Sequence, residues 1–239
     1  MRFLAAVDAM IGAFGHEDSR ALREAARATF EARTGTFRPE DPWFEARSRA
    51  FIDDALTLPE VLEGLTPRLP PEAQAWTAPF ARAHRGIFEA VDDDGDALLV
   101  RDLFSNAVFL VTDLDESTAI ALDAARGLFD ARLVGFADPP CVGVLPGPVF
   151  HDEEATPAIK EVLVAAKAMG LRAQDALDAL LRMEHKHRSL SRMKPAYAYK
   201  KEALVLAPTV QAGQAGQGQE PKSALGLRSR LTKRADSGT

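Results

Sequence analysis

Cysteine is almost absent from this sequence: Cys141 is the only one among 239 residues. A single thiol cannot form an internal disulfide or supply a zinc site that needs two thiolates. The sequence also lacks any apolar run approaching the roughly 18 residues that cross a bilayer. Its first residues carry the positive charge of a signal peptide, but Asp8 interrupts the apolar stretch and no small-residue cleavage site follows. We therefore expect a cytoplasmic protein.

Recognised catalytic and metal-binding motifs are missing as well. There is no Gly-x-Ser-x-Gly elbow, no Walker loop, no Gly-x-Gly-x-x-Gly turn and no His-Glu-x-x-His pair. The acidic stretch Asp92–Asp96 fails the calcium-loop pattern, which would put Ala90 and Arg101 at ligand positions. His185 and His187 stand two residues apart, so on a helix they face different directions. We expect no cofactor or metal, although catalytic groups that converge only in space would escape this search.

Charge is unevenly distributed along the chain. The net charge is −6, but residues 182–239 hold twelve basic and four acidic side chains, so that part carries +8. The preceding 181 residues carry −14. Such an asymmetry favours a basic arm that contacts an anionic partner or folds back on the acidic body. Solvated charge that keeps the protein in solution is the plainer alternative.

Residues 1–85 are expected to form a helical section. Apolar residues at helical spacing predict helices over 3–14 and from about Ser19 to Arg33. Asp41-Pro42 predicts the start of a well-packed helix whose apolar stripe includes Trp43 and Phe51, because aspartate caps helices and proline suits the first turn. A further helix is predicted over 72–83, bending before Pro79.

Residues 86–152 are expected to form a small antiparallel β-barrel or meander. Short apolar runs rich in β-branched and aromatic residues alternate here with Gly, Pro, Asn and Asp clusters. Asp94-Gly95 predicts a hairpin turn between the first two strands. The segment between Asp113 and Gly127 fits either a short helix or a long crossover.

The strand sequences Ile87–Val91, Leu99–Leu103, Val108–Val111 and Leu128–Leu133 suggest a family resemblance. Over roughly residues 40–165 the chain resembles the small β-domain of poorly characterised bacterial proteins that often end in a SEC-C zinc motif. The cysteine-rich motif itself is absent. The resemblance therefore implies the β-domain alone, and it transfers neither a zinc role nor a functional residue.

Residues 153–206 are expected to form a C-terminal helical hairpin, and residues 207–239 a disordered basic tail. Thr156-Pro157 starts the first helix of the hairpin, Gly170 ends it, and Pro195 closes the second. The tail begins with a run of Gly, Gln and Ala that has no apolar side chains to bury.

The helices around Gly170 also have the Ala-x-x-x-Gly spacing of a helix-turn-helix, through Ala166 and Gly170. The match is incomplete, because Ala176 stands where a branched apolar residue is expected and Leu177 comes one position late. Plain helical hairpins share this spacing.

These observations favour a non-enzymatic regulatory or scaffolding protein that binds another protein and uses a basic C-terminal arm for an anionic partner. One alternative is a nucleic-acid-binding regulator that uses the helix pair and the basic arm. A second is an enzyme with a dispersed site. The expected contacts with the anionic partner are Arg182, Lys186, Arg188, Arg192, Lys194, Lys200, Lys201, Arg228, Arg230, Lys233 and Arg234.

Overall fold

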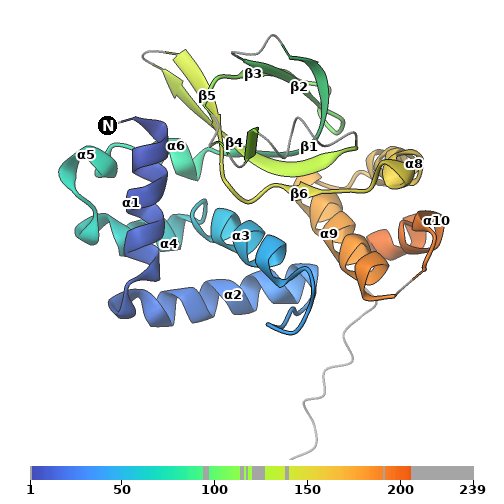
Figure 1. Ribbon diagram of the computed structural model, residues 1–239, viewed down its shortest axis with the longest axis horizontal. Helices are drawn as coiled ribbons and strands as arrows, with labels where there is room; N and C mark the ends of the chain where they lie inside the picture. The colour runs from blue at the N-terminus through green and yellow to red at the C-terminus, as the bar shows by residue number, and fades with distance from the viewer. Residues whose placement is uncertain are drawn as a thin grey trace, which may run out of the picture. The chain divides into compact units, whose positions relative to one another are not determined.

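The computed structural model describes residues 2–93, 97–113, 116, 118–119, 127–137, 140–190 and 192–205. Within these residues, helices pack around an antiparallel sheet, so the expected α+β class is confirmed (Figure 1). The predicted Asp94-Gly95 turn, most of the segment 114–126 and the predicted disordered tail 207–239 lie outside the described residues. Among the described helices, none combines the length and the apolar character needed to span a membrane.

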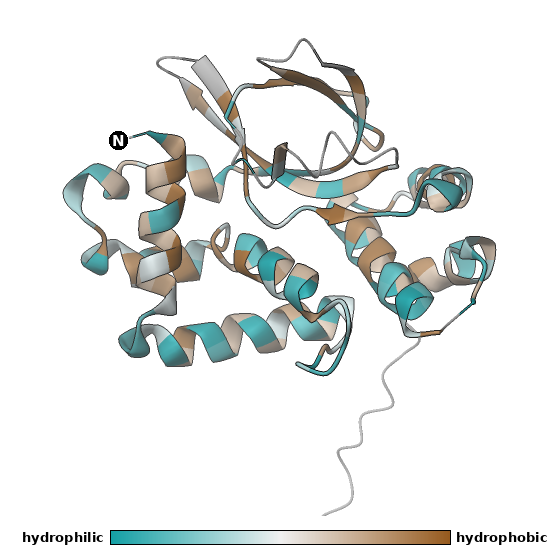
Figure 2. Cartoon of the chain, viewed as in Figure 1, coloured by the Kyte–Doolittle hydropathy of each residue, from teal (hydrophilic) through white to brown (hydrophobic). Residues whose placement is uncertain are grey.

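The N-terminal section consists of helices, as predicted. Its longer helices bury one apolar face each, and teal and brown segments alternate along α2 in Figure 2. Gly35 ends α2 with φ +95°, a backbone conformation that side chains disfavour. The elements are α1 (Phe3–Gly15), η1 (Glu17–Ser19), α2 (Arg20–Thr34), α3 (Phe44–Ala55), α4 (Pro59–Leu65), η2 (Thr66–Arg68), α5 (Pro71–Gln74) and α6 (Thr77–Ala81).

Three expectations for this section were wrong in detail. Asp41 does not cap a helix at Pro42: its carboxylate accepts from the backbone N–H of Arg38 at 2.8 Å and closes the preceding turn, and α3 starts at Phe44. Trp43, which precedes α3, is only half-buried. The single helix expected over 72–83 is two short ones, α5 and α6, separated by a turn.

The sheet is an antiparallel meander with the strand order β3-β2-β1-β4-β5, and β6 pairs with β4. Its strands are β1 (His84–Asp93), β2 (Leu98–Asp102), β3 (Val108–Val111), β4 (Phe129–Ala137), β5 (Pro140–Val144) and β6 (Val149–Phe150). A register shift between Ala90 and Asp92 marks a bulge in β1. The sheet curls but stays open, and a parallel bridge between Asp113 and Gly143 links its two edges (Figure 1).

The C-terminal section forms the expected pair of helices and continues into two short turns. Its elements are η3 (Glu153–Ala155), α8 (Thr156–Ala168), α9 (Ala173–Ser189), α10 (Pro195–Ala198) and η4 (Lys201–Leu204). Gly170 ends α8 with φ +69°, as expected of a glycine after a helix.

Three apolar clusters hold the elements together, and each contains at least one residue of β1 or β4. Phe88 and Leu133 lie inside the curled sheet. Their neighbours Ile87 and Val134 point the other way and pack against the C-terminal and N-terminal helices respectively. This alternation is the two-residue period of a strand with both faces covered. Both groups of helices therefore pack on the outer face of one sheet.

The packing of the apolar cluster among the N-terminal helices can be tested at Phe51. Its ring is buried and lies 6.0 Å from the ring of Phe14 and 5.8 Å from that of Phe30, measured between centroids. Phe51→Ala should lower the free energy of unfolding by about 3–5 kcal/mol, because it opens a cavity in the core. The exposed Val164→Ala on α8 is the control and should change it by less than about 0.5 kcal/mol in urea titrations. Equal, small effects of both substitutions would contradict this packing.

Candidate functional site

The helix-facing side of β1 and β4 carries charge where apolar residues are the rule. Arg85 of β1 stands directly opposite Arg132 of β4, and Asp130 is two residues from Arg132 on the same face. All three side chains are buried. Like charges directly opposite one another destabilise a strand pair, and buried charges are costly without partners. The two arginines therefore require acidic groups from elsewhere in the chain.

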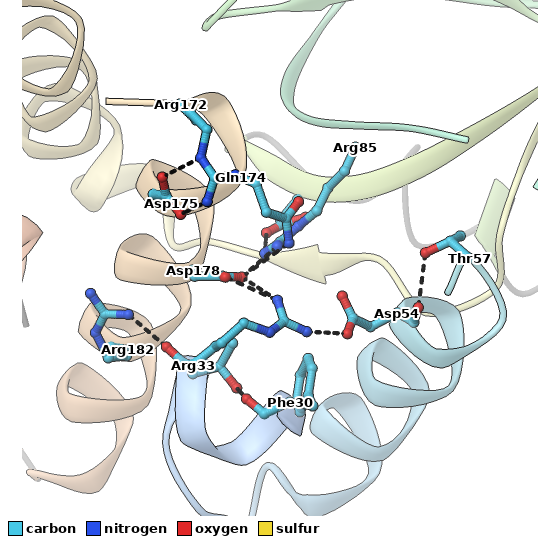
Figure 3. Close-up of polar contacts among 12 residues, drawn as sticks. Phe30, Arg33, Asp54, Thr57, Arg85, Arg172, Gln174, Asp175, Asp178 and Arg182 are labelled. Atoms are coloured by element: carbon cyan, nitrogen blue, oxygen red, sulfur yellow. Dashed lines mark hydrogen bonds and ion pairs between the residues drawn. The ribbon is translucent and has the colours of Figure 1, made fainter. Parts of the chain in front are cut away.

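Arg85 pairs with Asp130 on the sheet and with Asp178 on α9. Its Nε and Nη2 donate to the carboxylate of Asp130 at 3.1 and 2.8 Å, and its Nη1 donates to Asp178 of α9 at 2.6 Å (Figure 3 shows the contact with Asp178). Burial alone would lower the pKa of Arg85, but the two carboxylates outweigh burial and raise it above its usual value. Arg85 is therefore a permanent cation inside the protein.

Arg33 of α2 connects α9, which carries Asp178, with α3, which carries Asp54. Its Nη1 donates to both carboxylate oxygens of Asp178 at 3.0 and 2.9 Å, and its Nη2 donates to Asp54 of α3. Figure 3 shows its guanidinium lying between the two carboxylates. Asp54 also accepts from Arg132. Burial would raise the pKa of Asp54, but Arg132 and Arg33 overcome this and hold it below its usual value. We call these six residues the charge network: Arg33, Asp54, Arg85, Asp130, Arg132 and Asp178.

The charge network borders two hollows that meet at Arg33. One, of about 300 Å³, is lined by Arg33, Arg85 and Arg132 together with residues of α2 and of the α3–α4 connection. The other, of about 290 Å³, lies between Arg33, Asp178, Arg182 and the end of η4. Because the network itself holds three basic and three acidic groups, its buried charge balances.

A second buried polar group lies near the C-terminal end of α9. Nδ1 of His151 and the hydroxyl of Tyr199 are 2.9 Å apart, and both side chains are buried. Burial lowers the pKa of His151 to about 4 and raises the pKa of Tyr199. Glu184, which is paired with Arg188, also has its pKa raised by burial. These shifts follow from desolvation, the ordinary effect of a core.

Two of the residues expected to contact an anionic partner also make contacts within the protein. Arg182 donates to the backbone carbonyl of Arg33 at 2.6 Å, and burial lowers its pKa. Arg188 pairs with Glu184 and donates to the carbonyl of Phe150 at 3.0 Å. Arg182 is partly buried by its contact, whereas Arg188 stays exposed.

The other described members of the basic arm are available at the surface. Lys186, Arg192, Lys194, Lys200 and Lys201 are exposed at the end of α9 and along α10 and η4. Arg192 has φ +67°, so the chain leaving α9 turns through a left-handed residue before α10. Arg228, Arg230, Lys233 and Arg234 lie outside the described residues.

The metal-binding alternatives gain no support within the described residues, where no group of three or more His, Cys, Asp or Glu side chains converges. His185 packs edge-on against Trp43, with ring centroids 5.6 Å apart. His187 instead lies 3.0 Å from the carbonyl of Met193 through Nε2. The two histidines thus serve different neighbours, as their spacing predicted.

Comparison with known proteins leaves the resemblance to the SEC-C-associated β-domain as a prediction. No protein-family model, no curated protein and no solved structure matches this chain.

His151 should make the protein acid-sensitive. The groups that face His151 are Asp130 of β4, the adjacent Asp152, His187 and Arg188 of α9, and Tyr199. Burial has a larger effect on the pKa of His151 than the charges of these neighbours. Between pH 6.5 and about 4 the unfolded chain binds a proton at His151 and the folded chain does not. The free energy of unfolding should therefore fall as the pH falls through that window, by up to about 3 kcal/mol.

His151→Asn removes this titration. The amide oxygen of the new side chain lies near the former position of Nδ1 and can accept from the Tyr199 hydroxyl. Its unfolding free energy, from urea titrations at several pH values, should depend less steeply on pH than that of the wild type. His16→Asn, at an exposed site, is the control and should keep the wild-type slope. A wild-type slope in the His151 variant would contradict the assignment.

Proposed function

We propose that this chain is a non-enzymatic regulatory or scaffolding protein that binds another protein through its C-terminal surface. We define the C-terminal surface as the exposed residues at the end of α9 and along α10 and η4: Lys186, Leu190, Arg192, Lys194, Tyr197, Lys200, Lys201 and Val205. The partner's matching segment is acidic and carries apolar side chains.

One observation carries the proposal: large apolar side chains are exposed among these cations. Leu190, Tyr197 and Val205 are 47%, 61% and 59% exposed. Protein interfaces are built in this way, with aromatic and aliphatic anchors inside a charged rim that guides association. A merely solvated charged face has no need of the three apolar groups.

Support for a binding role also comes from the charge network. Asp54, Asp130 and Asp178 each accept a hydrogen bond from at least one guanidinium, so their oxygens already have fixed partners. A general base must be able to take up a proton near the working pH. The low pKa of Asp54 points away from that task and towards fixed electrostatic positioning.

Nucleic acid is the second candidate for the same surface, because its five cations suit phosphates and Tyr197 suits stacking. The helix pair adds little to this candidate. The residues of α9 from Ala176 to Leu181 are all buried, which leaves this stretch little free face to enter a groove. Lys200 lies 5.5 Å from the Tyr197 ring, so one face of that ring already has a neighbour.

Site-specific photo-cross-linking in cells tests the proposal. A photoreactive phenylalanine analogue at position 197 should give a discrete protein adduct, because an interface anchor lies against the partner. The adduct should disappear when Lys194, Lys200 and Lys201 are changed to Glu. The analogue at position 164, exposed on α8, is the matched control and should give none. Adducts that survive the charge reversal, or that form equally from position 164, would contradict the proposal.

A salt titration with fluorescent DNA separates the two partner classes. Only weak binding without sequence preference is expected near physiological salt. Tight binding, with a slope that falls by about one unit for each cation replaced by Gln, would favour nucleic acid instead. Lys194, Lys200 and Lys201 are the residues to replace, since Arg188 is already paired with Glu184.

A further inference from the structure

The last described part of the chain, residues 192–205, forms α10 and η4 and carries most of the C-terminal surface. We call it the C-terminal strap. Three of its side chains, Ala198, Tyr199 and Leu204, are buried and belong to the apolar cluster of α8 and α9. No described element follows the strap, so it can open without moving any other described element. Elements at the end of a folded body open at a smaller free-energy cost than its core.

Tyr199 contacts two histidines that come from different elements. Its ring centroid lies 5.9 Å from that of His151, which follows β6, and 6.0 Å from that of His187 on α9. The Tyr199 hydroxyl is 2.9 Å from Nδ1 of His151. Nε2 of His187 lies 3.0 Å from the backbone carbonyl of Met193, near the start of the strap. Histidine contacts therefore hold the strap at two points.

His151 has no acceptor for an added proton. Its Nε2 is buried and has no hydrogen-bond partner among the described residues, and Nδ1 has only the Tyr199 hydroxyl. A protonated imidazole carries two N–H donors, so one of them would be buried without an acceptor. Burial accordingly lowers the pKa of His151 to about 4. The charged and titratable groups that face the ring are Asp130 of β4, the adjacent Asp152, His187 and Arg188 of α9, and Tyr199.

His187 has different neighbours. Its Nε2 faces the Met193 carbonyl, and its Nδ1 lies 3.6 Å from the carboxylate of Asp152. A proton on this ring would thus have a carboxylate beside it. Because acid leaves this contact in place, His151 is the acid-sensitive contact of the strap.

We propose that protonation of His151 releases the C-terminal strap and so dismantles the C-terminal surface in acid. When the strap opens, Tyr199 leaves and water reaches the His151 ring, which can then carry its charge at little cost. The closed form binds this proton only below about pH 4, whereas the open form binds it below about 6.5, the ordinary pKa of histidine. The open form therefore gains population as the pH falls from 6.5 to about 4. Release needs no partner, and its effect on partner binding rests on the proposed function.

Hydrogen exchange of the full chain, read by mass spectrometry and corrected for intrinsic rates, measures this release. The fraction of open strap should rise by up to about tenfold for each pH unit between 6.5 and about 4. At every pH the strap should open at least about tenfold more often than the interior of α2, which reports unfolding of the body. Equal opening of the strap and α2, or opening of the strap that changes less than about twofold across the window, would overturn the proposal.

Two substitutions separate the proton from the packing. In His151→Asn the opening of the strap should vary by less than about twofold over the window, whereas the exposed His16→Asn should keep the wild-type rise. Tyr199→Phe removes only the hydroxyl and should raise opening about fivefold at neutral pH, because a hydrogen bond is lost. A wild-type rise in His151→Asn, or unchanged opening in Tyr199→Phe, would contradict the assignment.

This test and the photo-cross-linking fail independently. Acid-dependent opening of the strap without an adduct from position 197 would contradict the proposed function and support the release. An adduct from position 197 together with a strap whose opening ignores pH would support the proposed function and contradict the release.

Discussion

Two arginines that face each other across neighbouring strands set the main constraint on this fold. The pairing of β1 with β4 puts Arg85 opposite Arg132 on the face that the helices cover. Water cannot solvate them there, and each would repel the other at close range. The arrangement becomes stable when carboxylates reach this face. Asp130 supplies one from the sheet, and Asp54 and Asp178 supply the others from α3 and α9.

This requirement explains how the two helical sections are positioned. Apolar contacts hold helices on a sheet with little preference for rotation or sliding, whereas ion pairs fix donor and acceptor positions. On the helix side, Arg33 fixes these positions, because its guanidinium donates to Asp54 of α3 and to Asp178 of α9 (Figure 3). A buried ion pair often adds little net stability compared with an apolar replacement. We therefore regard the charge network as a device that specifies the packing geometry.

Helix α9 links the charge network to the C-terminal surface. Asp178 lies in the first half of α9 and anchors it to the sheet, while Lys186 and Leu190 at its other end belong to the C-terminal surface. The position of the C-terminal surface thus depends on α9, which the charge network holds against the sheet.

The sequence predicted the parts of the fold that depend on local pattern. Helical spacing located α1, α2, α8 and α9, and short apolar runs located the strands. Asp41 misled because a capping aspartate and a turn-closing aspartate look alike in sequence. The charge network was not predicted, since its members are distant in the chain. Asp130 and Arg132 did carry a signal for a buried ion pair. They have opposite charge, their spacing of two residues puts them on one face of a strand, and the neighbouring residues mark that strand as buried. Likewise, no sequence pattern showed that Arg182 and Arg188 contact backbone carbonyls of distant segments while Lys200 stays exposed.

A double-mutant cycle between Arg85 and Asp178 tests the role of the charge network most directly. Arg85→Met and Asp178→Leu should each lower the free energy of unfolding by about 3–5 kcal/mol, because each leaves buried charge without its partner. The double variant should cost less than the sum of the two by about 1–3 kcal/mol. The exposed pair Arg20 and Glu24 on α2 is the reference and should couple far more weakly than Arg85 and Asp178, because water screens it. Additivity of Arg85→Met and Asp178→Leu within about 0.5 kcal/mol would contradict the account.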